Sequence, residues 1–292
     1  MDKYPLVTIG VSAYNRKDYL QECLDSLLAQ SYPACEIIVI DDGSTDGTGA
    51  MMQEKYPQIK YVYQENAGDS AAKDHAARIG TGEYIVFNDS DDVFLPDAVE
   101  RLMNALPEND KNAVAYGTYI TIDASGTPLP TKRKTANYPS GHITGELLQH
   151  ILVNCTATLM PRELYLANGG LGPVRRVAAD YAFYLELSLK RNFYAVQNPV
   201  FLRRRHGNNL SGASYAKIFT AYQVFEDFVT RHHTVAGEFT EIIRRRRGDF
   251  HNKLYREARR EKLADKMRLH ARAAFRYTPG IKTFIRILAT IL

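Results

Sequence analysis

Several features of other protein classes are absent from this sequence of 292 residues. It has no continuous apolar run of about 18 residues, which is the minimum for a membrane-spanning helix. It has only three cysteines, and none of them belongs to a CxxC pair, which indicates reduced thiols. The first residues lead directly into an apolar strand without the layout of a signal peptide. We therefore expect a cytoplasmic protein.

Common catalytic motifs are missing as well. The sequence contains no HExxH, no GxSxG, no P-loop and no GxGxxG pattern. These absences argue against metalloprotease, serine hydrolase, P-loop nucleotidase and dinucleotide-dependent chemistry.

The charges are distributed unevenly along the chain. The formal net charge is +4, but residues 241–292 hold 15 lysines and arginines against 5 acidic residues, which gives this segment a charge of +10. Residues 1–240 therefore carry a charge of −6. This difference indicates a main body followed by an electrostatically distinct C-terminal segment.

Strand and helix patterns alternate in the first part of the chain. Strands are predicted at 6–11, 36–40, 60–64 and 83–89, and helices at 18–30, 50–55 and 70–79. The run EIIVI at 36–40 is almost entirely apolar, which is typical of a strand buried on both faces of a parallel sheet. The alternation predicts a doubly wound α/β sheet, in which ligands bind at the carboxyl ends of the strands.

The alternation ends after about residue 112. Residues 123–145 are rich in Gly, Pro, Ser, Thr and Lys, and we expect a long functional or mobile loop there. Helices are predicted at 145–153 and 178–190, a strand at 192–196, and helices throughout the chain from residue 213.

Three acidic residues, Asp89, Asp91 and Asp92, crowd the end of the fourth predicted strand in the stretch GEYIVFNDSDD. Two like charges 4 Å apart repel each other by about 1 kcal/mol even in water. Aspartate is common in turns because its side chain accepts hydrogen bonds from backbone N–H groups, so an ordinary loop is one explanation. The other is a divalent cation, since Mg²⁺ and Mn²⁺ prefer oxygen ligands and often bind phosphate oxygens as well.

Five segments of the chain together resemble the family 2 glycosyltransferases. They are VTIGVSAYNRKDYLQECLDSLLAQSYPACEIIVIDDGSTDGT, NAGDSAAKDHA, GEYIVFNDSDD and, later, NGGLGPVRRVAADYAFYLEL followed by FLRRRHGNNLSG. The resemblance covers about residues 5–212 and implies a Rossmann-like A-type glycosyltransferase fold with a mostly parallel central sheet. It also implies inverting, metal-dependent transfer of a hexosyl or N-acetylhexosaminyl group from a UDP-sugar. The acceptor would be a glycan or a lipid-linked molecule in surface polysaccharide biosynthesis, and the cofactor Mn²⁺ or Mg²⁺.

The resemblance also implies roles for residues that would bind the nucleotide-sugar. Ser12 and Tyr14, at the end of the first strand, would hold the base, with Tyr14 stacking on uracil and Ser12 offering a hydroxyl. Asp42 would accept the N–H of the base, and Asp89 would bind the ribose hydroxyls. Lys73 falls where the family often has a basic residue near the diphosphate, although a solvated helix lysine is the alternative.

The metal and the catalytic base are implied in the same way. Asp91, the second acid of the DxD motif, would bind the cation, and His206 would complete that site. Asp92 would contact the donor sugar or cap the following helix, and we expect the cap. Asp180 would be the general base that takes the proton of the acceptor hydroxyl, or else an aspartate that only stabilises a helix N-terminus. The family commonly shows Glu-Asp here, whereas this chain has Ala179 before Asp180.

Domain limits and partners follow from these expectations. We predict a catalytic domain at 1–212, with a nucleotide-binding half at 1–112 and an acceptor-binding half at 113–212, and a basic helical extension at 213–292. The last segment, 281–292, has apolar residues on one helical side, which suits either docking on the protein or contact with anionic lipid at the inner face of the cell membrane. No nucleic-acid partner is expected. The alternative functions are a nucleotidyltransferase and a non-catalytic module that binds nucleotide-sugars.

Overall fold

The computed structural model describes residues 4–130, 137–172, 177–207 and 214–280. The chain divides into two compact units. The first comprises Met1–Ile143, Val153–Phe183 and Leu187–Gly207, and the second Thr144–Leu152, Tyr184–Glu186 and Asn208–Leu292. The predicted domain boundary between residues 212 and 213 lies outside the described residues.

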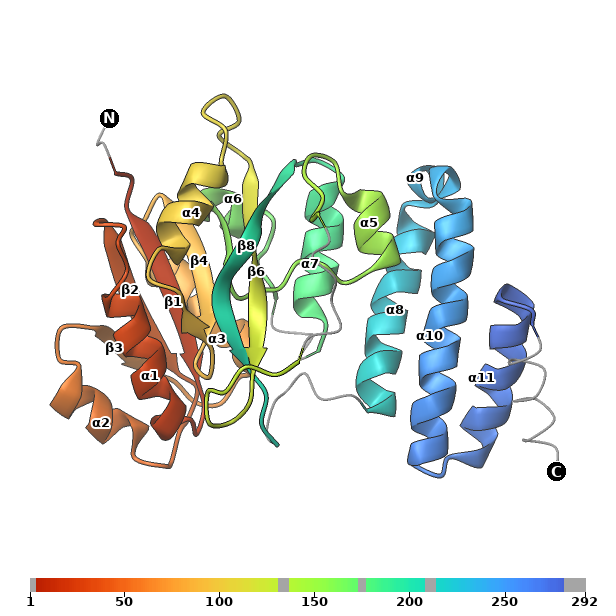
Figure 1. Ribbon diagram of the computed structural model, residues 1–292, viewed down its shortest axis with the longest axis horizontal. Helices are drawn as coiled ribbons and strands as arrows, with labels where there is room; N and C mark the ends of the chain where they lie inside the picture. Colours follow the sequence, from red (N-terminus) through yellow and green to blue (C-terminus); the bar gives the residue numbers. More distant parts are fainter. Residues whose placement is uncertain (1–3, 131–136, 173–176, 208–213, 281–292) are drawn as a thin grey trace. The chain divides into compact units, whose positions relative to one another are not determined.

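The first unit is built on one mixed sheet (Figure 1). Among the described residues, eight strands follow the order β3-β2-β1-β4-β7-β6-β8-β5. Their bounds are β1 Val7–Ala13, β2 Cys35–Asp41, β3 Lys60–Tyr63, β4 Tyr84–Asp89, β5 Val93–Phe94, β6 Val114–Ile122, β7 Thr158–Pro161 and β8 Phe193–Arg204. Strands β3, β2, β1 and β4 are parallel neighbours, as are β6 and β8, whereas β7 and β5 pair antiparallel. The predicted α/β class with a mostly parallel sheet is therefore correct.

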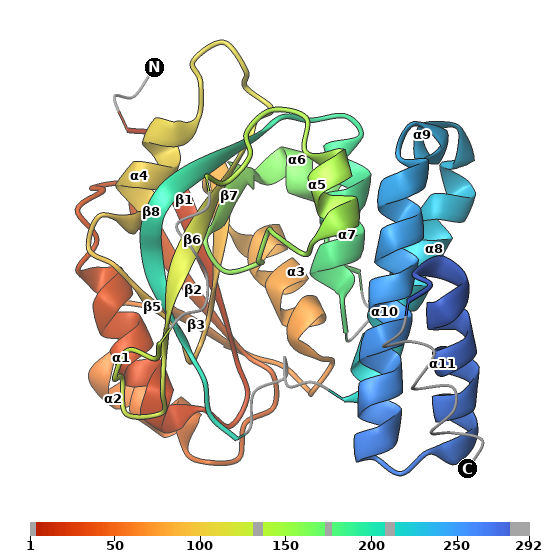
Figure 2. The ribbon, with the colours of Figure 1, turned by 45° about the vertical axis from the view of Figure 1, so that its right-hand side comes forward.

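Helices cover both faces of this sheet, and the strands lie between α1 and α3 in Figure 2. The helices are α1 Lys17–Leu28, α2 Thr48–Lys55, α3 Asp69–Ile79, α4 Ala98–Ala105 and α6 Arg162–Ala167. Strand β2 shows why its sequence is continuously apolar: Val39 packs in the core under α1, α2 and α4, whereas Ile38 and Ile40 pack against α3. Burial on both faces removes the polar positions that an exposed face would need.

The second half of this sheet differs from the sequence-based prediction. Strands β5, β6 and β7 had not been predicted, and β8 extends well beyond the predicted segment 192–196. Two antiparallel neighbours interrupt the strand–helix alternation, so the sequence in this part has no regular βα spacing to indicate them. Part of the expected loop at 123–145 lies outside the described residues, which resume at residue 137.

The second unit is helical in the part that the structure describes. Its helices are α5 Thr144–Gln149, α8 Tyr215–Arg231, α9 His233–Glu238, α10 Thr240–Arg260 and α11 Ala264–Tyr277. Helix α10 packs against α5, α8 and α11. Helices α8, α10 and α11 lie side by side in Figure 1. Across the described ranges, no helix is both long and apolar enough to cross a membrane. The predicted amphipathic segment 281–292 lies outside them.

Candidate active site

The parallel register brings the ends of three strands to one edge of the sheet. Ser12, in β1, is the register partner of Asp89 in β4, and Ala13 is the partner of Asp41 in β2. Because parallel strands point the same way, the residues that follow them collect at this edge. Most of the predicted site residues therefore lie in neighbouring turns although they are far apart in sequence.

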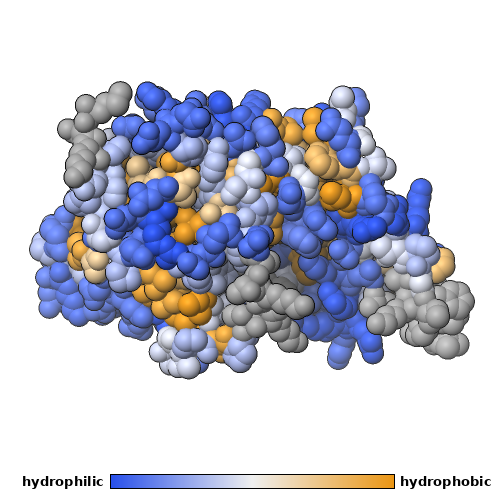
Figure 3. All heavy atoms as spheres, turned by 45° about the horizontal axis from the view of Figure 1, so that its top comes forward, coloured by the Kyte–Doolittle hydropathy of each residue, from blue (hydrophilic) through white to orange (hydrophobic). Residues whose placement is uncertain are grey.

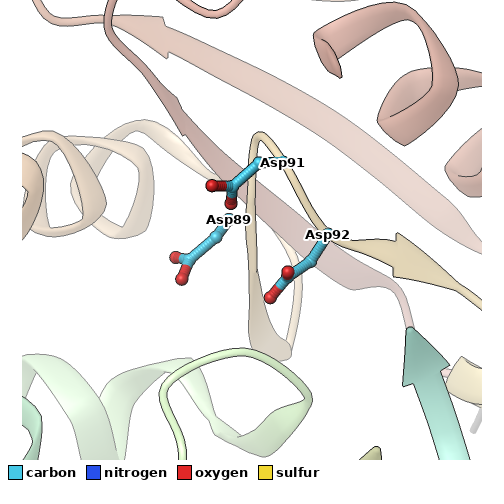
Figure 4. Close-up of side chains that lie close together, drawn as sticks. All are labelled: Asp89, Asp91 and Asp92. Carbon is cyan, nitrogen blue, oxygen red and sulfur yellow. The ribbon is translucent and has the colours of Figure 1, made fainter. Parts of the chain in front are cut away.

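Three carboxylates form an acidic cluster at this edge (Figure 4). Asp89 ends β4, and Asp91 and Asp92 lie in the turn to β5; one carboxylate oxygen from each residue falls within 4.8 Å of the others. Burial, followed by the charges of Asp89 and Asp91, raises the pKa of Asp92 well above its usual value. The cluster thus holds more negative charge than its surroundings favour, and a bound cation would offset this excess.

His206 joins the cluster from the residues after β8. Its Nε2 atom lies 2.8 Å from Oδ2 of Asp91, and the two side chains are only 6% and 14% exposed. An imidazole and several carboxylates form a donor set that suits Mn²⁺ or Mg²⁺. The residues present therefore fit a divalent cation.

The expected role of Asp92 as a helix cap is wrong. The turn continues into strand β5, and the next helix, α4, begins only at Ala98. Instead, Oδ1 of Asp92 accepts a hydrogen bond of 2.9 Å from the backbone N–H of Arg204 in β8. Asp92 therefore links the turn after β4 to a strand that lies more than 100 residues later in the chain.

Lys73 is buried beneath the site on α3. Its Nζ atom lies 2.8 Å from a carboxylate oxygen of Asp69 and 2.6 Å from one of Asp89. Burial alone would lower the pKa of Lys73, but the negative charges of these two carboxylates outweigh burial and raise it. Desolvation by itself would raise the pKa of Asp89, but the charge and hydrogen bond of Lys73, together with the charge of Arg203, outweigh it and lower that pKa. Ser12 donates a hydrogen bond of 2.5 Å to Asp69. A continuous polar network thus runs from the end of β1 to the end of β4.

Two further predicted nucleotide contacts lie on the β1 and β2 side of this edge. Asp42 is buried and accepts hydrogen bonds from the Gln64 side chain at 2.7 Å and from the backbone N–H groups of Ala67 and Gly68 at 2.8 Å each. Its carboxylate therefore shapes the loop that leads into α3. Tyr14 is 49% exposed, so its ring is accessible to a ligand.

Asp180 lies in the first turn of α7, Ala179–Ser188. The residue is half-buried, and its carboxylate accepts a hydrogen bond of 2.8 Å from the backbone N–H of Tyr181. Desolvation raises its pKa, and the nearby charges of Lys73 and Asp89 act on it in opposite directions. A carboxylate with a raised pKa is a stronger base than an exposed one, which suits proton abstraction.

Three residues of the site had not been singled out in the sequence. Asp69 pairs with Lys73, while Tyr19 and Arg204 contact the residues around His206. Asp69 follows a glycine at a helix start, which is a common place for an acid in any protein. Arg204 is one of three consecutive arginines, and only its 3% exposure distinguishes it from the exposed Arg205.

Comparisons with known proteins identify the family of this chain. The model of the family described as glycosyl transferase family 2 matches residues 8–165. A chondroitin synthase of Escherichia coli is 32% identical over 214 residues, which cover 72% of this chain but only 30% of that protein. A putative teichuronic acid biosynthesis glycosyltransferase, TuaG of Bacillus subtilis, is 30% identical over 235 residues, with 78% of this chain and 90% of that protein covered.

Two solved structures show a similar fold. The mannosyltransferase PcManGT from Pyrobaculum calidifontis, in complex with GDP-Man and Mn²⁺, superposes with a TM-score of 0.59 at 18% identity and covers 99% of this chain and 80% of its own. Residues 1–349 of S. aureus TarS, in complex with UDP-GlcNAc, give a TM-score of 0.55 at 15% identity and cover 98% and 89%. The predicted A-type fold is thus correct, and the chain is a glycosyltransferase that belongs to family 2.

Proposed function

We propose that this enzyme is an inverting, metal-dependent glycosyltransferase that moves a sugar from a UDP-sugar to a glycan or lipid-linked acceptor in surface polysaccharide biosynthesis. The observation that carries the proposal is the convergence of Asp89, Asp91 and His206 at the carboxyl edge of the sheet. The names of two relatives, a chondroitin synthase and a teichuronic acid biosynthesis glycosyltransferase, support a polysaccharide product.

Asp91 and His206 would hold the cation, with Asp89 beside them. A divalent cation there would neutralise the diphosphate of the donor and stabilise the charge that develops when the sugar leaves. The neighbouring mannosyltransferase was solved with Mn²⁺, which supports the same metal here. The three carboxylates that lie within 4.8 Å of one another support a bound cation independently of any relative.

The nucleotide would lie across the ends of β1, β2 and β4. Tyr14 would stack on the base. Asp42 would accept a hydrogen bond from the N–H of the base, and Ser12 would offer its hydroxyl. Asp89 would bind the ribose. Lys73 pairs with Asp89 and Asp69, so it holds the ribose-binding carboxylate in place and adds positive charge near the diphosphate. TarS was solved with UDP-GlcNAc and PcManGT with GDP-Man, so the fold accommodates either base and the choice of uridine rests on Asp42.

Asp180 would act as the general base. The acceptor hydroxyl attacks the anomeric carbon from the face opposite the diphosphate and passes its proton to the carboxylate, so the configuration of the anomeric carbon is inverted. Desolvation of Asp180 strengthens it as a base. Its place in the first turn of α7 keeps the anionic form stable enough to be present near neutral pH.

The proposal assigns catalysis to residues 1–212 and a supporting role to the basic extension at 213–292. Helix α11 exposes Leu269 and Phe275 among outward-facing Lys and Arg side chains, and Leu263, just before the helix, is exposed as well. At a membrane, insertion of these apolar side chains and attraction of the basic side chains to anionic lipid would act together. Each basic residue near the membrane surface adds about 1 kcal/mol to the binding free energy. Figure 3 shows mostly hydrophilic residues with separate apolar patches on the face it draws.

The test is metal-dependent nucleotide binding. UDP affinity is measured by calorimetry with Mn²⁺ and with EDTA, for the wild type and for Asp91→Asn. We expect the wild type to bind UDP tightly only with Mn²⁺, and Asp91→Asn to lose that difference while its circular dichroism spectrum is unchanged. The matched control is Asp97→Asn, because this aspartate lies outside the acidic cluster, is 53% exposed and forms an ion pair with Arg101. Equal UDP affinity of the wild type with and without EDTA would refute the metal dependence.

A further inference from the structure

Arg204 joins three separate parts of the chain next to the cation site. It is the last residue of β8 and is 3% exposed. Its Nε atom donates a hydrogen bond of 3.1 Å to the backbone carbonyl of Asp91, and its guanidinium forms an ion pair with Glu22 of α1. The same guanidinium donates to the carbonyls of Asp123, at 3.4 Å, and Ala124, at 3.2 Å. Its contacts thus tie the DxD turn to helix α1 and to the turn after β6.

Tyr19, on α1, lies against two residues of the segment after β8. The His206 imidazole stacks on the Tyr19 ring, with centroids 4.9 Å apart and planes 17° from parallel. The guanidinium carbon of Arg204 lies 5.1 Å from the centroid of the same ring. The Tyr19 ring therefore contacts both His206, a proposed metal ligand, and Arg204, which is hydrogen-bonded to the backbone of the other proposed ligand.

His206 needs such support because no strand pairing holds it. Strand β8 ends at Arg204, two residues before His206, and Asp91 lies in a turn between β4 and β5. Ligands of a cation must be kept within about 0.5 Å of their productive positions. For His206 the stacked ring sets the plane of the imidazole, and the contact of 2.8 Å with Asp91 sets its direction. For Asp91, the hydrogen bond from Arg204 to its carbonyl fixes the backbone.

We propose that Tyr19 and Arg204 are positioning residues that hold His206 and Asp91 in the arrangement that binds the divalent cation. This inference rests on the proposed function, because that function places the cation at Asp91 and His206. Residues that orient metal ligands typically contribute 10- to 100-fold in metal affinity. The contribution of Tyr19 comes from its ring alone, whereas that of Arg204 needs the planar guanidinium fork that lysine lacks.

The first measurement uses the metal-free protein. In the wild type, the ring current of Tyr19 shifts the Cε1–H resonance of His206 upfield, and His206→Gln identifies this resonance by its loss. We expect Tyr19→Leu to abolish the upfield shift and Tyr19→Phe to retain it. Loss of the shift in Tyr19→Leu but not in Tyr19→Phe would confirm that the ring lies against His206, and the metal affinity measured next tests whether this contact supports the ligand.

The second measurement is the affinity for Mn²⁺ alone, followed by electron paramagnetic resonance of the free ion. Tyr19→Leu and Arg204→Lys should weaken Mn²⁺ binding about 10- to 100-fold, while Tyr19→Phe and Arg205→Lys should bind as the wild type does. Arg205 is the matched control because it is adjacent to Arg204 but exposed. If Arg204→Lys does not fold, the Tyr19 pair decides the question.

Asp91→Asn separates failure of this inference from failure of the proposed function. If Asp91→Asn loses Mn²⁺ but Tyr19→Leu binds it as tightly as the wild type, the positioning role is wrong and the metal site stands. If the wild type binds no Mn²⁺, or if Asp91→Asn binds Mn²⁺ as tightly as the wild type, the metal site and the positioning role are both wrong. Unchanged His206 resonance in Tyr19→Leu would also overturn the positioning role.

Discussion

Replacement of Asp180 by asparagine separates a catalytic base from an aspartate that only begins a helix. Asparagine has nearly the same shape, and its side-chain oxygen can still accept the hydrogen bond from the Tyr181 N–H. An acid in the first turn of a helix is worth about 0.3–1 kcal/mol, and the desolvation that raises the Asp180 pKa offsets part of that. The free energy of unfolding should therefore change by less than about 1 kcal/mol.

The rate should change far more. Loss of a general base lowers turnover by about 10²–10⁴, which corresponds to about 3–5 kcal/mol of transition-state stabilisation. The assay is UDP release from the UDP-sugar that the wild type uses, chosen from a panel by thermal shift with Mn²⁺. Affinity for that UDP-sugar should stay near the wild-type value in Asp180→Asn, because the base acts on the acceptor rather than on the nucleotide.

The pH dependence adds an independent check. Because desolvation raises the pKa of Asp180, the carboxylate becomes protonated at a higher pH than an exposed aspartate, and the protonated form cannot accept the acceptor's proton. The rate of the wild type should fall as the pH falls through this raised pKa, and Asp180→Asn should lack this limb. Near-normal turnover in Asp180→Asn would refute the assignment and leave Asp180 as a helix-start residue.

Three further predictions concern the rest of the molecule. Lys73→Met should destabilise the protein by several kcal/mol in urea unfolding, since it leaves Asp69 and Asp89 without their buried partner. Unchanged stability would show that these ion pairs make no net contribution to the free energy of unfolding. Burial lowers the pKa of His270 in the folded protein from 6.5 to about 4. As the pH falls, His270 therefore takes up a proton in the unfolded chain before it does so in the folded protein. Up to about 3 kcal/mol of folding stability should be lost as the pH falls from 6.5 towards 4. Chemical denaturation at several pH values tests this, and His270→Gln should reduce the acid dependence. Substitution of Leu269 by serine should weaken co-sedimentation with anionic vesicles at low salt without changing UDP binding; equal pelleting would count against the lipid contact.

The nucleotide-binding half of the fold could be predicted because its signals are local. The apolar run of β2 and the helical spacing of α1 identify their elements within a few residues of chain. Parallel strands then require that Asp41 and Asp89, which follow separate strands, reach the same edge. The approximate place of the acidic site therefore follows from the sequence before any coordinate is known.

The partners of those residues could not be predicted, because they depend on strands and helices that are distant in sequence. Asp92 looks like a helix cap in its local sequence, yet it accepts a hydrogen bond from Arg204. Strand β7 enters antiparallel between β4 and β6, and no local periodicity shows that insertion.

Side-chain type and spacing thus predicted a cluster of acids at the end of the sheet, and the family resemblance added His206 to it. Only the tertiary structure decided which groups hold them there: Lys73 between two carboxylates, and the Tyr19 ring against His206. The physical reason is that periodicity is a property of a few consecutive residues. Burial of one arginine among three, or the stacking of two rings, depends instead on the distances set by the whole packed sheet and its helices.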